Sequence, residues 1–261
     1  MPPRELLASR ELSVEFGGVR ALAGVDISVR EGEILAVIGP NGAGKTTFFN
    51  AITGACRPTG GRVFLEGRDI TGLKPHQVAR LGLARSFQNL KPFAEMTVAD
   101  NVLIGRELHL KSGLLDAVLR TPRFRADEEQ NRREVRELIA FVGLHERRNT
   151  LARNLTYGEQ KMLEIARALA LEPRILLLDE PVAGMNPTET GFVMDLVRKI
   201  REQGITVVLI EHDMRMVMGI CERIYVLDHG ELIACGEPAE IRRNEKVIEA
   251  YLGGGKRAPH Q

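Results

Sequence analysis

The chain has 261 residues, which is enough for one large α/β domain with a substantial core. Its 36 lysines and arginines balance 35 aspartates and glutamates, so the net charge of +1 favours neither nucleic acid nor an anionic membrane as a partner. No apolar run reaches the ~18–20 residues that a membrane-spanning helix needs, and the first residues, MPPRELLASREL, lack the apolar core of a signal peptide. We therefore expect a cytoplasmic protein that reaches a membrane only through a partner.

The first third of the chain carries strand patterns that lead into a loop and a helix. Apolar and polar positions alternate from LSVEF onward, as in half-buried strands. Residues 34–39, ILAVIG, form a continuous apolar run that predicts a buried strand. Residues 45–54, KTTFFNAITG, predict a helix that stops at its glycine. We expect a short strand pair in GGRVFLEGRDI and a helix over 75–84 that starts at Pro75.

The pattern changes to a mostly helical one between about residues 95 and 152. TVADNVLIGRELHL begins with Thr97 and reads as a capped helix. SGLLDAVLR and RADEEQNRREVRELIAFVGL continue as helix, with a break at Thr121-Pro122. One face of the second segment is apolar, at Val135, Leu138, Ile139 and Val142. This composition predicts a helical subdomain inserted over about residues 89–157.

Strands and helices alternate again after the insert, which is typical of an α/β fold. EQKMLEIARALALEP and PTETGFVMDLVRKIREQG predict helices, and RILLLDE and TVVLIEH predict buried strands. ERIYVLDHGELIACG reads as two strands joined by a turn. EPAEIRRNEKVIEAYLG predicts a terminal helical region, and residues 253–261, GGGKRAPHQ, a flexible tail.

Residues 39–47, GPNGAGKTT, match a phosphate-binding loop in the required setting, after a buried strand and before a helix. The glycines allow a tight turn with backbone N–H groups aimed inward, and the helix adds its positive end. Lys45 would meet the β- and γ-phosphates, and the Thr46 hydroxyl would bind Mg²⁺. The residues predicted to bind nucleotide are Gly39, Pro40, Asn41, Gly42, Ala43, Gly44, Lys45, Thr46 and Thr47.

Two carboxylates, Asp179 and Glu180, follow the apolar run ILLL. An aspartate at a strand end beside a phosphate loop can hold Mg²⁺ through water. Glu180 should point away from Asp179, because side chains alternate along a strand. Without the phosphate loop, an ordinary solvated turn would explain the pair equally well.

Four segments in a fixed order resemble the nucleotide-binding subunit of an ATP-binding cassette (ABC) transporter: GPNGAGKTT, NLTYGEQ (154–160), RILLLDEP (174–181) and VVLIEHD (207–213). The resemblance covers about residues 5–252. It implies an α/β P-loop NTPase with a RecA-like core, an antiparallel β subdomain and an inserted helical subdomain. The single nucleotide-binding domain would span 1–261, with its core and β subdomain drawn from about 5–88 and 158–252.

The resemblance also implies roles for single residues, with ATP and Mg²⁺ as cofactors. Glu180 would act as the general base that polarises the attacking water, and His212 would contact the γ-phosphate. Gln88 would bind Mg²⁺ or its water and carry motion to a membrane subunit, so the implied metal ligands are Thr46, Gln88 and Asp179. Phe16 lies where the family places a ring that stacks on adenine, although a core position explains it nearly as well.

The second segment corresponds to the family signature Leu-Ser-Gly-Gly-Gln, here Leu155, Thr156, Tyr157, Gly158 and Glu159. In the family it covers the ATP held by the other subunit, so function implies a dimer with two composite sites. Thr156 keeps the hydroxyl that would bond a γ-phosphate, and Glu159 should point aside because its charge would repel that phosphate. A plain helix cap at Thr156 is the alternative. The family's usual aspartate after the strand carboxylates is replaced by Asn186.

Several departures from the common pattern resemble one branch, the longer ATP-binding subunit of branched-chain amino acid importers. They are YGEQ, AGMNPTE, SFQNLKPFAEMTVADNVL and the closing RRNEKVIEAYLG. Urea or amide importers and lipopolysaccharide exporters use similar ATPases. The branch implies two integral membrane permeases, a second identical or different ATPase and, indirectly, a periplasmic solute-binding protein. The protein would then lie peripherally on the cytoplasmic face of the inner membrane, with no nucleic acid partner.

The groove near residues 88–96, with FAEM at 93–96, and the helical insert would receive the membrane subunits. The alternative is that the insert packs against the chain's own core. Rival classes share parts of the pattern. Ribosome-acting ABC ATPases usually carry two cassettes, DNA-repair ABC ATPases carry long coiled coils, and a small-molecule kinase has no need of NLTYGEQ. A soluble nucleotide sensor differs in its partners, because a transport ATPase should co-purify with integral membrane proteins.

Overall fold

A computed structural model describes residues 4–86, 92–106 and 121–252. The chain forms two compact units, one of residues 1–83 and 177–261 and the other of residues 84–176. The predicted position of Gln88, the segment SGLLDAVLR and the tail 253–261 lie outside the described residues. Among the described helices, none is long and apolar enough to cross a membrane.

The larger sheet supplies the core of the first unit. Its strand order is β10-β9-β3-β8-β7-β6, with β3 parallel to both β8 and β9, and β10 antiparallel to β9. The strands are β3 (Ile34–Ile38), β6 (Leu83–Ser86), β7 (Ile175–Asp179), β8 (Thr206–Ile210), β9 (Arg223–Asp228) and β10 (Glu231–Gly236). Every residue of β3, β7 and β8 is buried, as the continuous apolar runs predict for strands covered on both faces.

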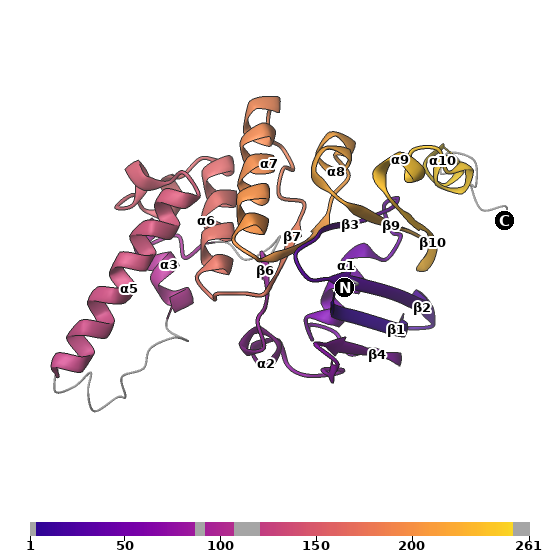
Figure 1. Ribbon diagram of the computed structural model, residues 1–261, viewed down its shortest axis with the longest axis horizontal. Coiled ribbons are helices and arrows are strands. Elements are labelled where there is room, and N and C mark those ends of the chain that lie inside the picture. The colour runs from indigo at the N-terminus through magenta and orange to yellow at the C-terminus, as the bar shows by residue number, and fades with distance from the viewer. Residues whose placement is uncertain (1–3, 87–91, 107–120, 253–261) are drawn as a thin grey trace. The chain divides into compact units, whose positions relative to one another are not determined.

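Helices cover both faces of this sheet. In Figure 1, α7 and α8 lie on one side of β3 and α1 on the other. The helices of this unit are α1 (Lys45–Ile52), α2 (Pro75–Arg80), α7 (Pro187–Glu202), α8 (Met214–Ile220), α9 (Pro238–Ile241) and α10 (Glu245–Leu252). The α/β class predicted from the alternation of strands and helices is confirmed.

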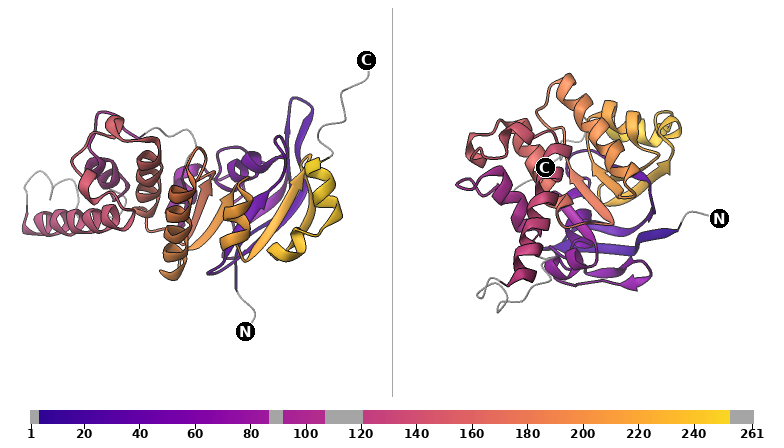
Figure 2. Two further views of the ribbon diagram at one scale, coloured as in Figure 1. Left: turned by 90° about the horizontal axis from the view of Figure 1, so that it is seen from above. Right: turned by 60° about the vertical axis from the view of Figure 1, so that its left-hand side comes forward.

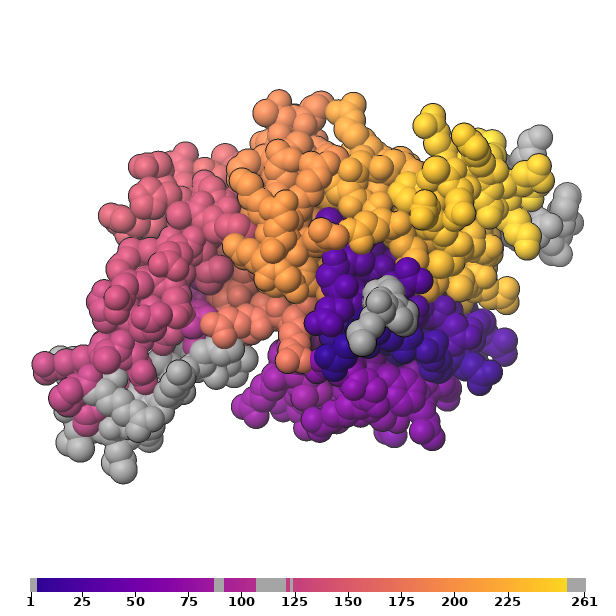
Figure 3. All heavy atoms as spheres, in the orientation of Figure 1, coloured from indigo at the N-terminus to yellow at the C-terminus, as the bar shows by residue number. Residues whose placement is uncertain are grey.

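A second, antiparallel sheet has the order β2-β1-β4-β5. Its strands are β1 (Glu5–Phe16), β2 (Val19–Arg30), β4 (Gly60–Leu65) and β5 (Arg68–Asp69). The register between β1 and β2 shifts at several irregular positions and ends with Phe16 opposite Val19. This is the predicted antiparallel β subdomain, and its indigo and purple surface lies next to the yellow C-terminal residues in Figure 3.

The second unit is helical, and α3, α5 and α6 lie side by side in it (Figure 2). Its helices are α3 (Val98–Arg106), α5 (Pro122–Phe141) and α6 (Tyr157–Leu169), with short 3₁₀ turns η2 (His145–Arg147) and η3 (Ala152–Asn154). As predicted, the Thr97 hydroxyl accepts from the N–H of Asp100 at 3.1 Å. The expected break at Thr121-Pro122 is the start of α5, where Thr121 accepts from the N–H of Phe124.

The prediction of one helix over 75–84 is wrong at its end. Helix α2 stops at Arg80, and β6 already begins at Leu83. Gly82 lies between them with φ +92, a left-handed conformation that ends helices readily. The apolar residues after Arg80 therefore belong to a buried strand and not to the helix.

Candidate nucleotide-binding site

The phosphate-binding loop connects β3 to α1, as the sequence predicts. Gly39 has φ +152, and a Cβ added there would lie 2.0 Å from the carbonyl oxygen of Leu227. Gly44 has φ +100, and a Cβ there would lie 2.6 Å from the carbonyl oxygen of Ala21. Only glycine fits these positions, because the loop is pressed against β9 and β2 at its two ends.

The ammonium of Lys45, the first residue of α1, is turned into this loop. Its Nζ donates to the carbonyl oxygens of Gly39 at 2.7 Å and Pro40 at 2.9 Å. Burial lowers the pKa of Lys45 below its ordinary 10.5, while the charges of Glu180 and Asp179 act in the opposite direction. The loop cation and the two carboxylates predicted from separate segments therefore lie close enough to interact.

The carboxylates follow β7 with different surroundings. Asp179 is the last strand residue and is 1% exposed. Glu180 has φ +47, and its N–H donates to the carbonyl oxygen of Ile210 at 2.8 Å. Because Glu180 follows the last residue of β7 and has a left-handed backbone, the alternation of side chains along a strand no longer applies to it. Its Oε1 lies 3.8 Å from Nδ1 of His212, which follows β8, so the residue expected to act as the base and the histidine expected to contact the γ-phosphate are neighbours.

Phe16 lies on the surface of the β subdomain. It is 53% exposed, and Val19, its cross-strand neighbour, is 68% exposed. The alternative that Phe16 belongs to the core is therefore wrong. The two side chains offer apolar surface at the end of the β1–β2 hairpin, in the same unit as the phosphate loop. A flat ring exposed in this way can stack on a base.

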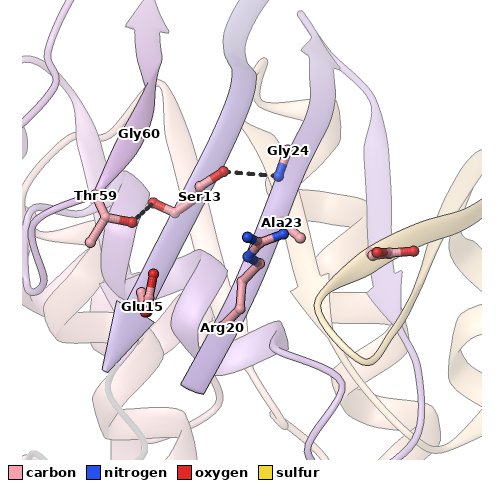
Figure 4. Close-up of a pocket in the computed structure, with 8 residues that line it drawn as sticks. Ser13, Glu15, Arg20, Ala23, Gly24, Thr59 and Gly60 are labelled. Carbon is pink, nitrogen blue, oxygen red and sulfur yellow. Dashed lines mark hydrogen bonds between the residues drawn. The ribbon is translucent and has the colours of Figure 1, made fainter. Parts of the chain in front are cut away.

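A separate depression lies on the β subdomain, shown in Figure 4. It is lined by Ser13, Glu15, Arg20, Ala23, Gly24, Thr59, Gly60 and Glu231. The Ser13 hydroxyl accepts from the N–H of Gly24 at 3.0 Å, and the Thr59 hydroxyl donates to the carbonyl of Ser13 at 3.1 Å. None of the predicted nucleotide-binding residues lines it, so it is distinct from the phosphate loop.

The signature segment starts α6 in the second unit. The Thr156 hydroxyl accepts from the N–H of Glu159 at 3.3 Å, and the Glu159 carboxylate accepts from the N–H of Thr156 at 2.9 Å, which together form a capping box. Arg147 donates to the other oxygen of Glu159 at 2.8 Å. The helix cap given as the alternative for Thr156 is present, and the Glu159 carboxylate is turned to this cap and to Arg147. Burial alone would raise the pKa of Glu159, but these bonds lower it below 4.5.

Asn186 shows why an amide can replace the usual aspartate. Its Oδ1 accepts from the N–H groups of Thr188 at 2.9 Å and Glu189 at 3.0 Å, and so caps α7. The Glu189 carboxylate accepts in return from the N–H of Asn186. Because the cap needs only an acceptor oxygen, the loss of charge leaves this local structure intact.

Two residues near the predicted site were missed in the sequence. Glu211, after β8, is 1% exposed and accepts from the N–H groups of His212 and Asp213. A glutamate directly after the apolar run TVVLI was the available signal. Tyr251, on α10, has its hydroxyl at the backbone of Gly39, and burial raises its pKa above 10.0 although that hydrogen bond lowers it. The sequence carries no signal for that contact.

The loop, its lysine and the acidic residues together identify the class of protein. A glycine loop between a buried parallel strand and a helix, with a lysine inside the loop and acidic residues after another strand of the same sheet, is the site of a P-loop nucleoside triphosphatase. Neither glycine at the loop ends admits a side chain, which fits the close approach of backbone N–H groups to phosphate.

Comparison with known proteins narrows the class. The family model described as ABC transporter matches residues 22–183, and the model described as branched-chain amino acid ATP-binding cassette transporter matches residues 231–257. The chain is 47% identical over 95% of its length, and 98% of the relative's, to the high-affinity branched-chain amino acid transport ATP-binding protein LivG of Salmonella typhimurium. It is 45% identical to BraF of Pseudomonas aeruginosa, a protein with the same description, over 96% and 98% of the two chains.

Solved structures agree with the sequence comparison. A crystal structure of the ADP conformation of an ATP-binding cassette of an ABC transporter matches with a TM-score of 0.83 and 34% identity, over 95% of this chain and 99% of that one. A nucleotide-free ATP-binding cassette matches with the same TM-score at 33% identity, over 95% and 98%. The chain belongs to the ABC transporter family, as an ATP-binding subunit with the nucleotide-binding fold predicted from its sequence.

Proposed function

We propose that this ATPase powers the uptake of branched-chain amino acids through membrane partner subunits. The observation that carries the solute class is the match of residues 231–257 to the branched-chain model, in a chain that is 47% identical to LivG over nearly all of both sequences. An ATPase subunit of such a transporter contacts its membrane partners and does not contact the solute. The solute class is therefore inferred from relatedness, whereas the phosphate chemistry is inferred from the site.

The loop, its lysine and the carboxylates would have different roles in binding the triphosphate and its Mg²⁺. The N–H groups of the glycine loop and the Lys45 ammonium, which lies at the carbonyls of Gly39 and Pro40, would bind the β- and γ-phosphates. Thr46 and Asp179 are the oxygen donors that fit Mg²⁺, together with Gln88 in the proposed set. Mg²⁺, when bound, would neutralise phosphate charge and needs only one or two protein oxygens. The phosphates and water can supply its other ligands.

Glu180 is the proposed general base. It directly follows β7, within range of the Lys45 charge, and its side chain is 28% exposed, so that a water molecule can reach it. Asp179, at 1% exposed, is less accessible to the attacking water. His212, 3.8 Å from Glu180, would contact the γ-phosphate. A base must reach the proton that it removes, and of the two carboxylates Glu180 is the better placed.

The signature residues 155–159 would cover the ATP of a second ATPase subunit, identical or different, with Phe16 stacked on the adenine of its own site. Two permeases would receive the motion through Gln88 and the surface near residues 93–96, and a periplasmic solute-binding protein would deliver the solute. Phe93 supports that docking surface, because it is 48% exposed and carries the Arg167 guanidinium 5.1 Å from its ring centre. The protein would then be peripheral, on the cytoplasmic face of the inner membrane.

ATP turnover of Glu180→Gln tests the catalytic assignment. We expect turnover to fall by about 10²–10⁴-fold, the usual contribution of a general base, with ATP binding kept and dimerisation strengthened. Glu202→Gln, which changes an exposed glutamate at the end of α7, serves as the matched control and should leave turnover unchanged. Undiminished turnover in Glu180→Gln would exclude it as the base.

A pull-down of the tagged protein from detergent-solubilised native membranes tests the transport assignment. Two multispanning proteins, a second short cassette and a periplasmic amino-acid-binding protein are the expected partners. A second candidate exists because the lipopolysaccharide export ATP-binding protein LptB of Acidithiobacillus ferridurans is 40% identical over 95% of this chain and 97% of that protein. Export partners without a solute-binding protein would support that alternative, and exclusively soluble partners would overturn both.

A further inference from the structure

A buried glutamate connects the two segments that carry Glu180 and His212. Glu211 directly follows β8, and its side chain has no exposed surface. Its Oε1 accepts from the N–H of Val182 at 3.1 Å. Its Oε2 accepts from the N–H groups of His212 at 2.9 Å and Asp213 at 3.0 Å. An enclosed carboxylate needs such partners, and here they come from two different loops.

These bonds tie the loop after β7 to the end of β8 on both sides of Pro181. Before the proline, the N–H of Glu180 donates to the carbonyl of Ile210 at 2.8 Å. After it, the N–H of Val182 donates to Glu211. Glu180 has φ +47, which is unfavourable for a residue with a side chain and persists only where the surroundings hold it. The two ties supply that support.

We propose that Glu211 is a positioning residue, which joins the backbone after Glu180 to the backbone of His212 so that the two loops move as one unit. The inference rests on the proposed roles of Glu180 and His212. Glu211 does not act on substrate itself, because its side chain is enclosed and its oxygens are occupied by backbone N–H groups. Its effect on turnover passes through the placement of the other two residues.

A second buried glutamate of the same unit provides a matched control. Glu33 is 5% exposed and accepts from the N–H of Arg30 at 2.6 Å and from the Arg223 guanidinium at 2.6 Å. It precedes β3, whereas Glu211 follows β8, and these strands are parallel. The two glutamates therefore lie at opposite edges of the sheet. Loss of a buried charge affects both, but only Glu211 contacts the catalytic loops.

The full chain is compared as wild type, Glu211→Gln, Glu33→Gln and Glu180→Gln. Glutamine keeps the size of glutamate but turns an N–H₂ group toward one of the three backbone N–H donors. In nucleotide-free Glu211→Gln we expect amide hydrogen exchange of residues 182–186 to rise about tenfold, which corresponds to about 1.4 kcal/mol and to the loss of one hydrogen bond to a charged group. Turnover should fall by about tenfold or more, while the Kd for ATP changes less than about threefold.

Glu33→Gln should leave the exchange of residues 182–186 and the turnover unchanged, whatever its effect on thermal stability. Equal exchange and turnover in Glu211→Gln and wild type, or equal changes in both glutamate variants, would overturn the proposal. If Glu211→Gln does not fold, Glu211→Asp keeps the charge but is one methylene shorter, and it should show the same faster exchange at Val182. Full turnover in Glu180→Gln would instead refute the base assignment, and the exchange result would still decide whether Glu211 joins the loops.

Discussion

Replacing Phe16 by alanine should weaken ATP binding without weakening the fold. Because Phe16 is 53% exposed at the end of a hairpin, its removal leaves no core cavity, and we expect a change in stability within about 0.5 kcal/mol. Stacking of a base on an aromatic ring contributes about 1–3 kcal/mol when it is measured by alanine substitution. That range corresponds to an increase in the Kd for ATP of about 5- to 150-fold.

The assay compares ATP with inorganic triphosphate, which has the phosphates but no base. Titration calorimetry is carried out on wild type, Phe16→Ala, Phe16→Leu and Phe16→Tyr. Relative to wild type, Phe16→Ala should lose affinity for ATP but not for triphosphate. The tyrosine variant should bind like wild type, and the leucine variant should fall between, because it keeps apolar surface but no ring. Equal losses for ATP and triphosphate, or a loss accompanied by a lower melting temperature, would show that Phe16 supports the structure of the site and does not hold adenine.

Other substitutions test the loop, the core and the signature segment. Gly44→Ala places a Cβ 2.6 Å from the carbonyl oxygen of Ala21 at φ +100, and should cost about 2–4 kcal/mol in denaturant unfolding and abolish ATP binding. Arg223→Met leaves the buried Glu33 without the guanidinium of Arg223 and should lower the free energy of unfolding by about 3–5 kcal/mol. Part of this loss should be recovered when Glu33 is also replaced by methionine. Glu159 has a lowered pKa, so its stabilisation is present above pH 4.5 and is lost as the pH falls through that lowered value. The melting-temperature difference between wild type and Glu159→Gln should therefore close in acid, and a constant difference would contradict it.

Local sequence patterns were sufficient to predict the parts of the fold whose structure is determined by one continuous segment. The apolar runs at β3, β7 and β8 are buried at every residue, because strands between helix layers have both faces covered. The loop before α1 could be predicted because its glycines, lysine and threonine come from one continuous segment. The end of α2 could not, because the residues after Gly82 pair in a sheet whose other strands are distant in sequence.

The same limit explains the residues that were missed or left open at the site. Glu180 has a positive φ, and the hydrogen bonds around it, from its own N–H to Ile210 and from the N–H of Val182 to Glu211, reach about 30 residues further along the chain. The sequence pattern does not determine whether Phe16 is buried or exposed, because an aromatic residue at a strand end is compatible with both. Only the register of β1 against β2 places it opposite the exposed Val19.

The two interpretations of the signature segment are compatible because of the chemistry of its groups. In the cap, the Thr156 hydroxyl accepts a hydrogen bond from the N–H of Glu159, which uses one lone pair and leaves the O–H proton to donate elsewhere. The charge of Glu159 is balanced by Arg147 at 2.8 Å, which reduces its repulsion of a phosphate near the start of α6. A capping box formed in this way presents a hydroxyl donor and the positive end of a helix toward an anion. The features that make the segment a stable helix start therefore also suit it to cover the phosphates of a second subunit.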